Sequence, residues 1–82
     1  MRILIESTEK IVELSQQGAA GSVPARVWEG HTDEGIPVIC YVTRIATPEP
    51  VSATTAARFA QCLTETRAPS PVVAAIPARL IL

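Results

Sequence analysis

Apolar and polar residues alternate in several short stretches of the chain, with the period of two that β-strands show when one face is buried. The alternation predicts strands over residues 2–6, 10–14, 23–29, 36–46 and 75–82. The first two stretches are interrupted by Ser7-Thr8-Glu9, so they form either one bent strand or a tight hairpin. Residues 15–22 (SQQGAAGS) are small and polar, which predicts a loop between two strands.

The stretch 36–46 is the longest of these and is apolar at both alternating sets of positions. A strand of that kind is typically covered on both faces, so the pattern predicts a central strand. Residues 30–35 join it to the strand at 23–29, and Gly30 and Gly35 are expected to supply the positive φ angles of a hairpin turn.

A helix is predicted over residues 53–66, with Ser52 as its N-cap. Its apolar positions recur at helical spacing and form one stripe: Ala56, Phe59, Ala60 and Leu63. We expect this stripe to pack on the sheet. Pro69 and Pro71 end the helix, and Pro77 predicts that the last strand lies at a sheet edge. The predicted fold class is therefore α+β: a single small domain, residues 1–82, with a mainly antiparallel sheet of about five strands and one helix packed on it, in the order β-β-β-β-α-β.

Composition adds a prediction about assembly. Apolar residues make up 48% of the chain and charged residues only 18%, whereas an ordinary domain has about 25% charged residues. So short and apolar a chain has more hydrophobic surface than one copy hides easily, which predicts a homo-oligomer.

Charge and cysteine content narrow the class of partner and the compartment. Proteins that bind DNA or RNA usually carry a strongly basic surface, whereas the formal net charge of this chain is −1. No apolar run approaches the ~20 residues of a membrane helix, and the charge of Glu6 interrupts the N-terminal apolar run too early for a secretory signal. Cys40 and Cys62 fit neither a disulfide framework nor a metal motif, and buried free thiols are expected. We expect a cytoplasmic protein without metal, cofactor or membrane partner.

The distribution of polar side chains argues against an enzyme. The single histidine, His31, falls in the predicted turn, and the serines and threonines have no neighbouring base to activate them. The acidic residues lie in turns or are scattered over strand faces, with no sign of a paired carboxylate site. We therefore expect no catalytic residue, and a protein that acts by binding.

Arginine and aromatic residues are the candidates for binding. Arg26 and Trp28 are two apart on one strand and share a face, so they either stack a base and clamp a phosphate or fill an interface and its rim. Arg44 continues the face of Val38, Cys40 and Val42 on the next strand, either as a rim residue or as an anion ligand. Tyr41 and Thr43 are expected to offer hydroxyls on the opposite face of that strand. Arg79, amid apolar neighbours, should meet an acid or a ligand phosphate. The predicted ligand-binding set is Arg26, Trp28, Tyr41, Thr43, Arg44 and Arg79.

Six stretches together resemble a family of short proteins encoded by tailed bacteriophages and prophages. They are residues 5–12 (IESTEKIV), 23–30 (VPARVWEG), 35–38 (GIPV), 43–46 (TRIA), 67–70 (RAPS) and 76–82 (IPARLIL). A compact, non-catalytic, oligomeric phage protein is similar in kind to the anti-defence sponges, which bind cyclic nucleotide messengers of bacterial immunity.

The resemblance implies a phage protein that acts in the host cytoplasm and sequesters a cyclic nucleotide immune signal, an ADP-ribose isomer or a cyclic oligonucleotide, at a subunit interface. The alternative is a phage protein that inhibits or adapts a host protein by direct binding, through an exposed edge strand or an apolar patch, with no nucleotide ligand. A structural component of the virion is a third reading.

Overall fold

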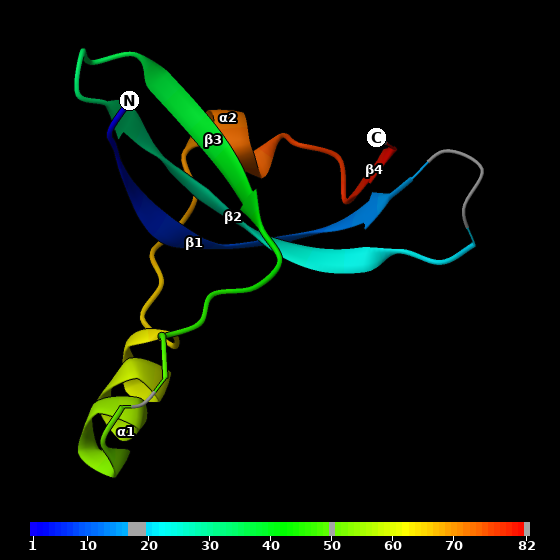
Figure 1. Cartoon of the computed structure of the whole chain (residues 1–82). Coiled ribbons are helices and arrows are strands. Elements are labelled where there is room, and N and C mark those ends of the chain that lie inside the picture. Colours follow the sequence, from blue (N-terminus) through cyan, green and yellow to red (C-terminus); the bar gives the residue numbers. More distant parts are fainter. Residues whose placement is uncertain (17–19, 50, 82) are drawn as a thin grey trace.

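The computed structural model describes residues 1–16, 20–49 and 51–81. The elements follow one another as β1 (Ile3–Ser15), β2 (Val23–Thr32), β3 (Pro37–Val42), α1 (Ala53–Cys62), α2 (Pro71–Ala74) and β4 (Arg79–Ile81). The four strands form one mixed sheet in the order β3-β2-β1-β4 (Figure 1). The α+β class is confirmed, with the order β-β-β-α-α-β in place of the predicted one.

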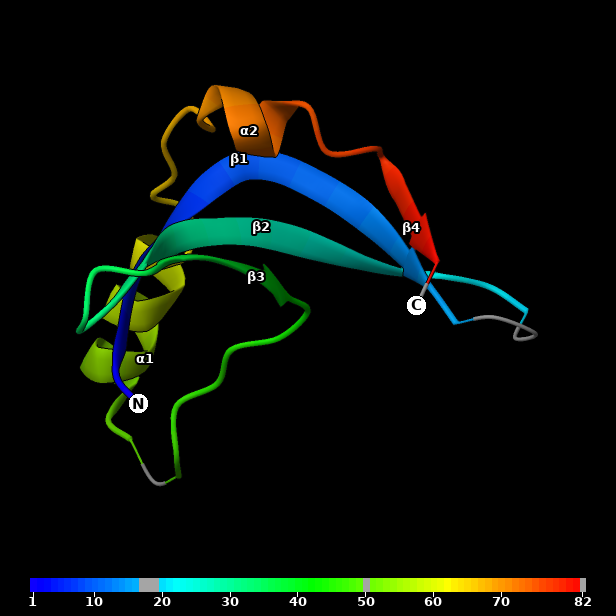
Figure 2. The ribbon, with the colours of Figure 1, turned by 90° about the horizontal axis from the view of Figure 1, so that it is seen from above.

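The first strand is long and bent, so of the two readings of residues 2–14 the single bent strand is correct. The antiparallel register between β1 and β2 shifts between Ser7 and Ile11. Buried Thr8 stabilises the irregularity, since its hydroxyl donates to the Val27 carbonyl (2.7 Å) and accepts from the Lys10 N–H (3.2 Å). Figure 2 shows β1 and β2 arching together.

The strand predicted to be central lies at an edge. β3 spans only Pro37–Val42 and pairs with β2 alone among the described strands. Thr43 and Arg44 leave the sheet, since the chain turns away after Val42 toward Pro48. Gly30 is also not in the turn but inside β2, where a Cβ atom would collide with the Leu4 carbonyl of β1; Gly35 does have a positive φ of 83°.

The C-terminal part departs most from the prediction. The predicted strand 75–82 is shorter: β4 covers Arg79–Ile81 and pairs in parallel with β1 at the other edge of the sheet, where Pro77 leads into it. The predicted end of the helix at residue 66 is also too late, because α1 ends at Cys62. A second helix, α2, begins at Pro71 with Ser70 as N-cap.

The core is small and lies on one face of the sheet, between the strands and α2. Its buried side chains are Val12, Ala25, Val27 and Val73, with Leu14, Ile76 and Leu80 packed around them. We call this the packed face, and the face that carries Arg26 and Trp28 the open face. The packed face is thus covered by α2 rather than by the helix that the sequence predicted to cover the sheet.

Most of helix α1 lies away from the sheet, and its C-terminal end comes near it (Figure 1). All ten of its residues are described, and none is buried, so the prediction that its stripe packs on the sheet is wrong. Two of the four stripe residues are alanines, which offer little apolar area. Among the described residues, no helix is long and apolar enough to cross a bilayer.

Candidate functional site

A hollow of about 220 Å³ lies on the open face where β2, β3 and the end of α1 meet. It brings together four of the six residues predicted to bind a ligand: Arg26, Trp28, Thr43 and Arg44. Apolar residues complete the lining: Ile11, Pro24, Ala25, Val42, Ile45 and Leu63. A guanidinium pair, an indole and a hydroxyl therefore share one concave surface.

The strand register explains why Arg26 and Trp28 meet there. Arg26 lies opposite Ile11 on β1 and Val42 on β3, and Trp28 lies opposite Cys40, so these side chains project to one face. Arg26 is held in place, because its Nη1 donates to the carbonyl of Thr8 (2.8 Å) at the bend of β1. The bend thus orients the guanidinium and leaves other N–H groups of it available.

Two predicted residues lie elsewhere. Tyr41 is opposite Val27, so its side chain projects to the packed face, where it is 40% exposed at the sheet edge. Arg79 is exposed on β4 opposite Glu13, and neither residue lines the hollow. The sequence placed Thr43 on the face opposite to Arg44, but both line the same hollow, because both follow the end of β3.

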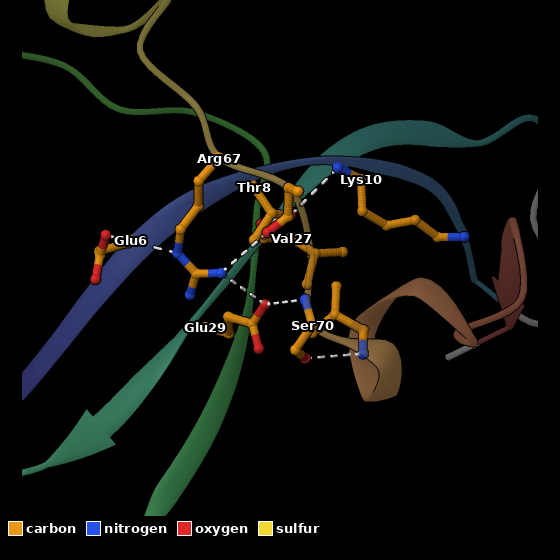
Figure 3. Close-up of polar contacts among 9 residues, drawn as sticks. Glu6, Thr8, Lys10, Val27, Glu29, Arg67 and Ser70 are labelled. Carbon is orange, nitrogen blue, oxygen red and sulfur yellow. Dashed lines mark hydrogen bonds and ion pairs between the residues drawn. The ribbon is translucent and has the colours of Figure 1, made fainter.

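A second polar cluster, on the packed face, was not predicted (Figure 3). Glu6 and Glu29 are direct cross-strand partners, which is an unfavourable pairing of like charges. Arg67 lies between them, with its Nε 3.5 Å from Glu6 Oε2 and its Nη1 3.2 Å from Glu29 Oε2. The Ser70 N–H also donates to Glu29 Oε2 (2.8 Å). Glu29 therefore joins the sheet to the start of α2.

The hydrogen bonds from Ser70, together with the nearby Arg67 guanidinium, hold the pKa of Glu29 below its ordinary value. The backbone adds to the connection: the Glu9 N–H donates to the Arg67 carbonyl (2.9 Å), and the Arg67 N–H donates to the Ser7 carbonyl (3.2 Å). Arg67 thus docks the segment after α1 beside the bend of β1. This cluster is occupied by its own ion pairs, so its geometry is that of a structural clamp.

The candidate metal ligands and the two cysteines lie outside the hollow. No group of three or more histidine, cysteine or acidic side chains is close enough there to hold a metal ion. Cys40 and Cys62 are both free, with Cys40 half-buried and Cys62 exposed on α1. The expectation that both thiols are buried is therefore wrong for Cys62, because α1 does not pack on the sheet.

No family model, no curated protein and no solved structure matches this chain.

Proposed function

We propose that this chain is a non-enzymatic phage anti-defence protein that sequesters a cyclic nucleotide immune signal, an ADP-ribose isomer or a cyclic oligonucleotide, in the host cytoplasm. The observation that carries the proposal is the convergence of Arg26, Arg44 and Trp28 in one hollow. Arginine suits bidentate binding of phosphate, and the face of an indole suits stacking of a base. Thr43 adds a hydroxyl that can donate to a phosphate oxygen, or donate to or accept from the edge of a base.

The size of the hollow supports a site shared between subunits. Its volume of about 220 Å³ is below the roughly 300–1,000 Å³ of typical ligand pockets, so one copy encloses only part of a nucleotide. Val42 at the end of β3 and the following Thr43 and Arg44 line the hollow, so it adjoins the apolar edge strand. A second subunit placed there adds the missing walls. Sequestration of this kind needs only affinity and no chemical step.

The test is a thermal-shift screen with cyclic dinucleotides, cyclic trinucleotides and cyclic ADP-ribose isomers. A ligand at about 100 times its Kd should raise the Tm of a domain of this size by about 10–20 °C. Mass spectrometry of the ligand released on denaturation should find it unchanged. If every compound leaves the Tm where it was, the nucleotide proposal fails, and capture of one host polypeptide would favour the protein-directed alternative.

Arginine variants locate the site. Arg26→Ala and Arg44→Ala should each reduce affinity by about tenfold or more, since each removes a charge-assisted hydrogen bond worth about 1.5–3 kcal/mol. Arg2→Ala is the matched control, because Arg2 is exposed and lies outside the hollow. Arg79→Ala decides whether the site extends along the open face to β4. Equal loss of affinity in Arg2→Ala would mean that the arginines act only through net charge.

A further inference from the structure

Strand β3 has an unprotected outer edge. Within the described part of the chain its outer side pairs with no strand, and its residues (PVICYV) include no charge. Its register with β2 runs without a bulge. Edge strands of monomeric proteins usually carry lysine, proline or bulges that block pairing with another chain. In β3 the one such feature is Pro37, at the first position of the strand.

The backbone groups at this edge can be identified. The Thr32 N–H donates to the Ile36 carbonyl (2.9 Å), so Thr32 and Ile36 form a hydrogen-bonded pair. Along an antiparallel ladder, hydrogen-bonded pairs and pairs without hydrogen bonds alternate from there. The alternation turns the N–H and C=O groups of Ile39 and Tyr41 away from β2, toward solvent. Pro37 belongs to the same outward set, which agrees with its lack of an N–H. The edge is therefore ready to form a ladder with another strand.

The exposed area of one copy is too large for a monomer of this mass. The chain exposes 6190 Å², whereas a folded monomer of 8.7 kDa exposes about 4,700 Å². Its radius of gyration is 14.7 Å, against about 12 Å for a compact domain of this length. The excess of about 1,500 Å² per copy would give an interface of about 3,000 Å² in total, within the range of obligate homodimers.

The stripe of α1 is the second uncovered apolar surface at this end of the molecule. Leu63, its last member, lines the same hollow as Val42 and Ile45, so the end of the stripe lies close to the end of β3. We call the outer edge of Pro37–Val42, together with the α1 stripe (Ala56, Phe59, Ala60 and Leu63), the assembly surface. Of these stripe residues only Phe59 is even half-buried in one copy.

We propose that a second copy of this chain covers the assembly surface, with the two β3 strands paired edge to edge and antiparallel about a two-fold axis. The two four-stranded sheets then form one continuous sheet, and the α1 stripe packs against the same second copy. This arrangement makes β3 a central strand, which is the environment that its two apolar faces favour. The inference deepens the proposed function and rests on it for the shared site, but its test needs no nucleotide.

The test is the molar mass of the purified protein by size exclusion with light scattering, over a wide range of concentrations. The wild-type chain should have at least twice the 8.7 kDa of one copy. Ile39→Lys places a charge on the pairing edge and should shift the protein to the 8.7 kDa species. Val72→Lys is the matched control: Val72 is 69% exposed on α2, outside the assembly surface, and its variant should keep the wild-type mass.

Amide hydrogen exchange of the wild-type protein gives a second test that does not depend on a variant folding. The outward N–H groups of Ile39 and Tyr41 should be protected in the assembled protein and lose that protection on dilution to single copies. Fast exchange of both in the assembled protein, a wild-type mass of 8.7 kDa, or dissociation by Val72→Lys would each overturn the proposal. If the protein is an oligomer that binds no nucleotide, the proposed ligand is wrong and this interface stands. If it is a monomer that binds a nucleotide, this interface is wrong and the proposed ligand stands.

Discussion

The two faces of the sheet come from the same alternating strands but differ in what covers them. On the packed face, α2 and β4 close a small core around Val12 and Val27, and Arg67 bridges two carboxylates. On the open face, Trp28 and Arg26 border a hollow of about 220 Å³. Alternation therefore separates the two faces: the packed face stabilises the single copy, and the open face carries the hollow in which we propose that a ligand binds.

The largest effect should come from the core of the packed face. Val73 on α2 is fully buried, so Val73→Ala should lower the free energy of unfolding by about 2 kcal/mol, from lost burial and the cavity left behind. Val72→Ala changes the neighbouring residue, which is 69% exposed, and should change the free energy of unfolding by less than about 0.5 kcal/mol. Urea denaturation of both variants measures the difference. Similar costs would mean that α2 does not close the core.

The polar clamp should have the next largest effect. Arg67→Ala leaves Glu6 and Glu29 facing each other without a counter-charge and should lower the free energy of unfolding by about 1–2 kcal/mol. The corresponding change on the open face, Arg44→Ala, should cost less than about 0.5 kcal/mol because Arg44 is exposed. Denaturation of both variants in low and high salt measures these changes in the free energy of unfolding. The stability that Arg67→Ala loses relative to wild type should be smaller in high salt.

Acid should weaken the packed face selectively. The pKa of Glu29 is lower in the folded chain than in the unfolded chain, so its ionised form stabilises the fold. That stabilisation is fully present above the unfolded pKa, near 4.5, and is lost as the pH falls through the lowered folded pKa. Wild type should therefore lose more stability than Glu29→Gln between pH 6 and pH 3, roughly the window that brackets an ordinary glutamate. Parallel pH profiles would mean that Glu29 contributes nothing through its charge.

The sequence predicted local features well and pairing poorly. Alternation located the strands, Ser52 was recognised as an N-cap, and the two-residue spacing of Arg26 and Trp28 put them in one hollow. The edge position of β3 was not predicted. Two apolar faces show only that something covers the strand, and a second copy is able to provide that cover. Strand order depends on contacts that a single sequence pattern does not contain.

Two features of the packed face, helix α2 and Arg67, differ in whether the sequence contains a signal that predicts them. Helix α2 has one, since Ser70-Pro71 is a capping serine followed by proline at the first helical position. The prolines were read only as the end of α1. Arg67 had no such signal, because its role follows from the register that sets Glu6 opposite Glu29, 23 residues apart in the chain.

The smallest effect compares the caps of the two helices. Ser52 Oγ accepts from the Thr55 N–H (3.1 Å) at α1, and Ser70 Oγ accepts from the Val73 N–H (3.4 Å) at α2. Ser70→Ala should lower the free energy of unfolding by about 0.5 kcal/mol, since α2 is part of the core. In dilute single copies, Ser52→Ala should reduce only the helix content seen by circular dichroism. If a second copy covers the α1 stripe, Ser52→Ala should also lower the Tm at high protein concentration. A lower Tm at every concentration would instead mean that α1 already stabilises the single copy.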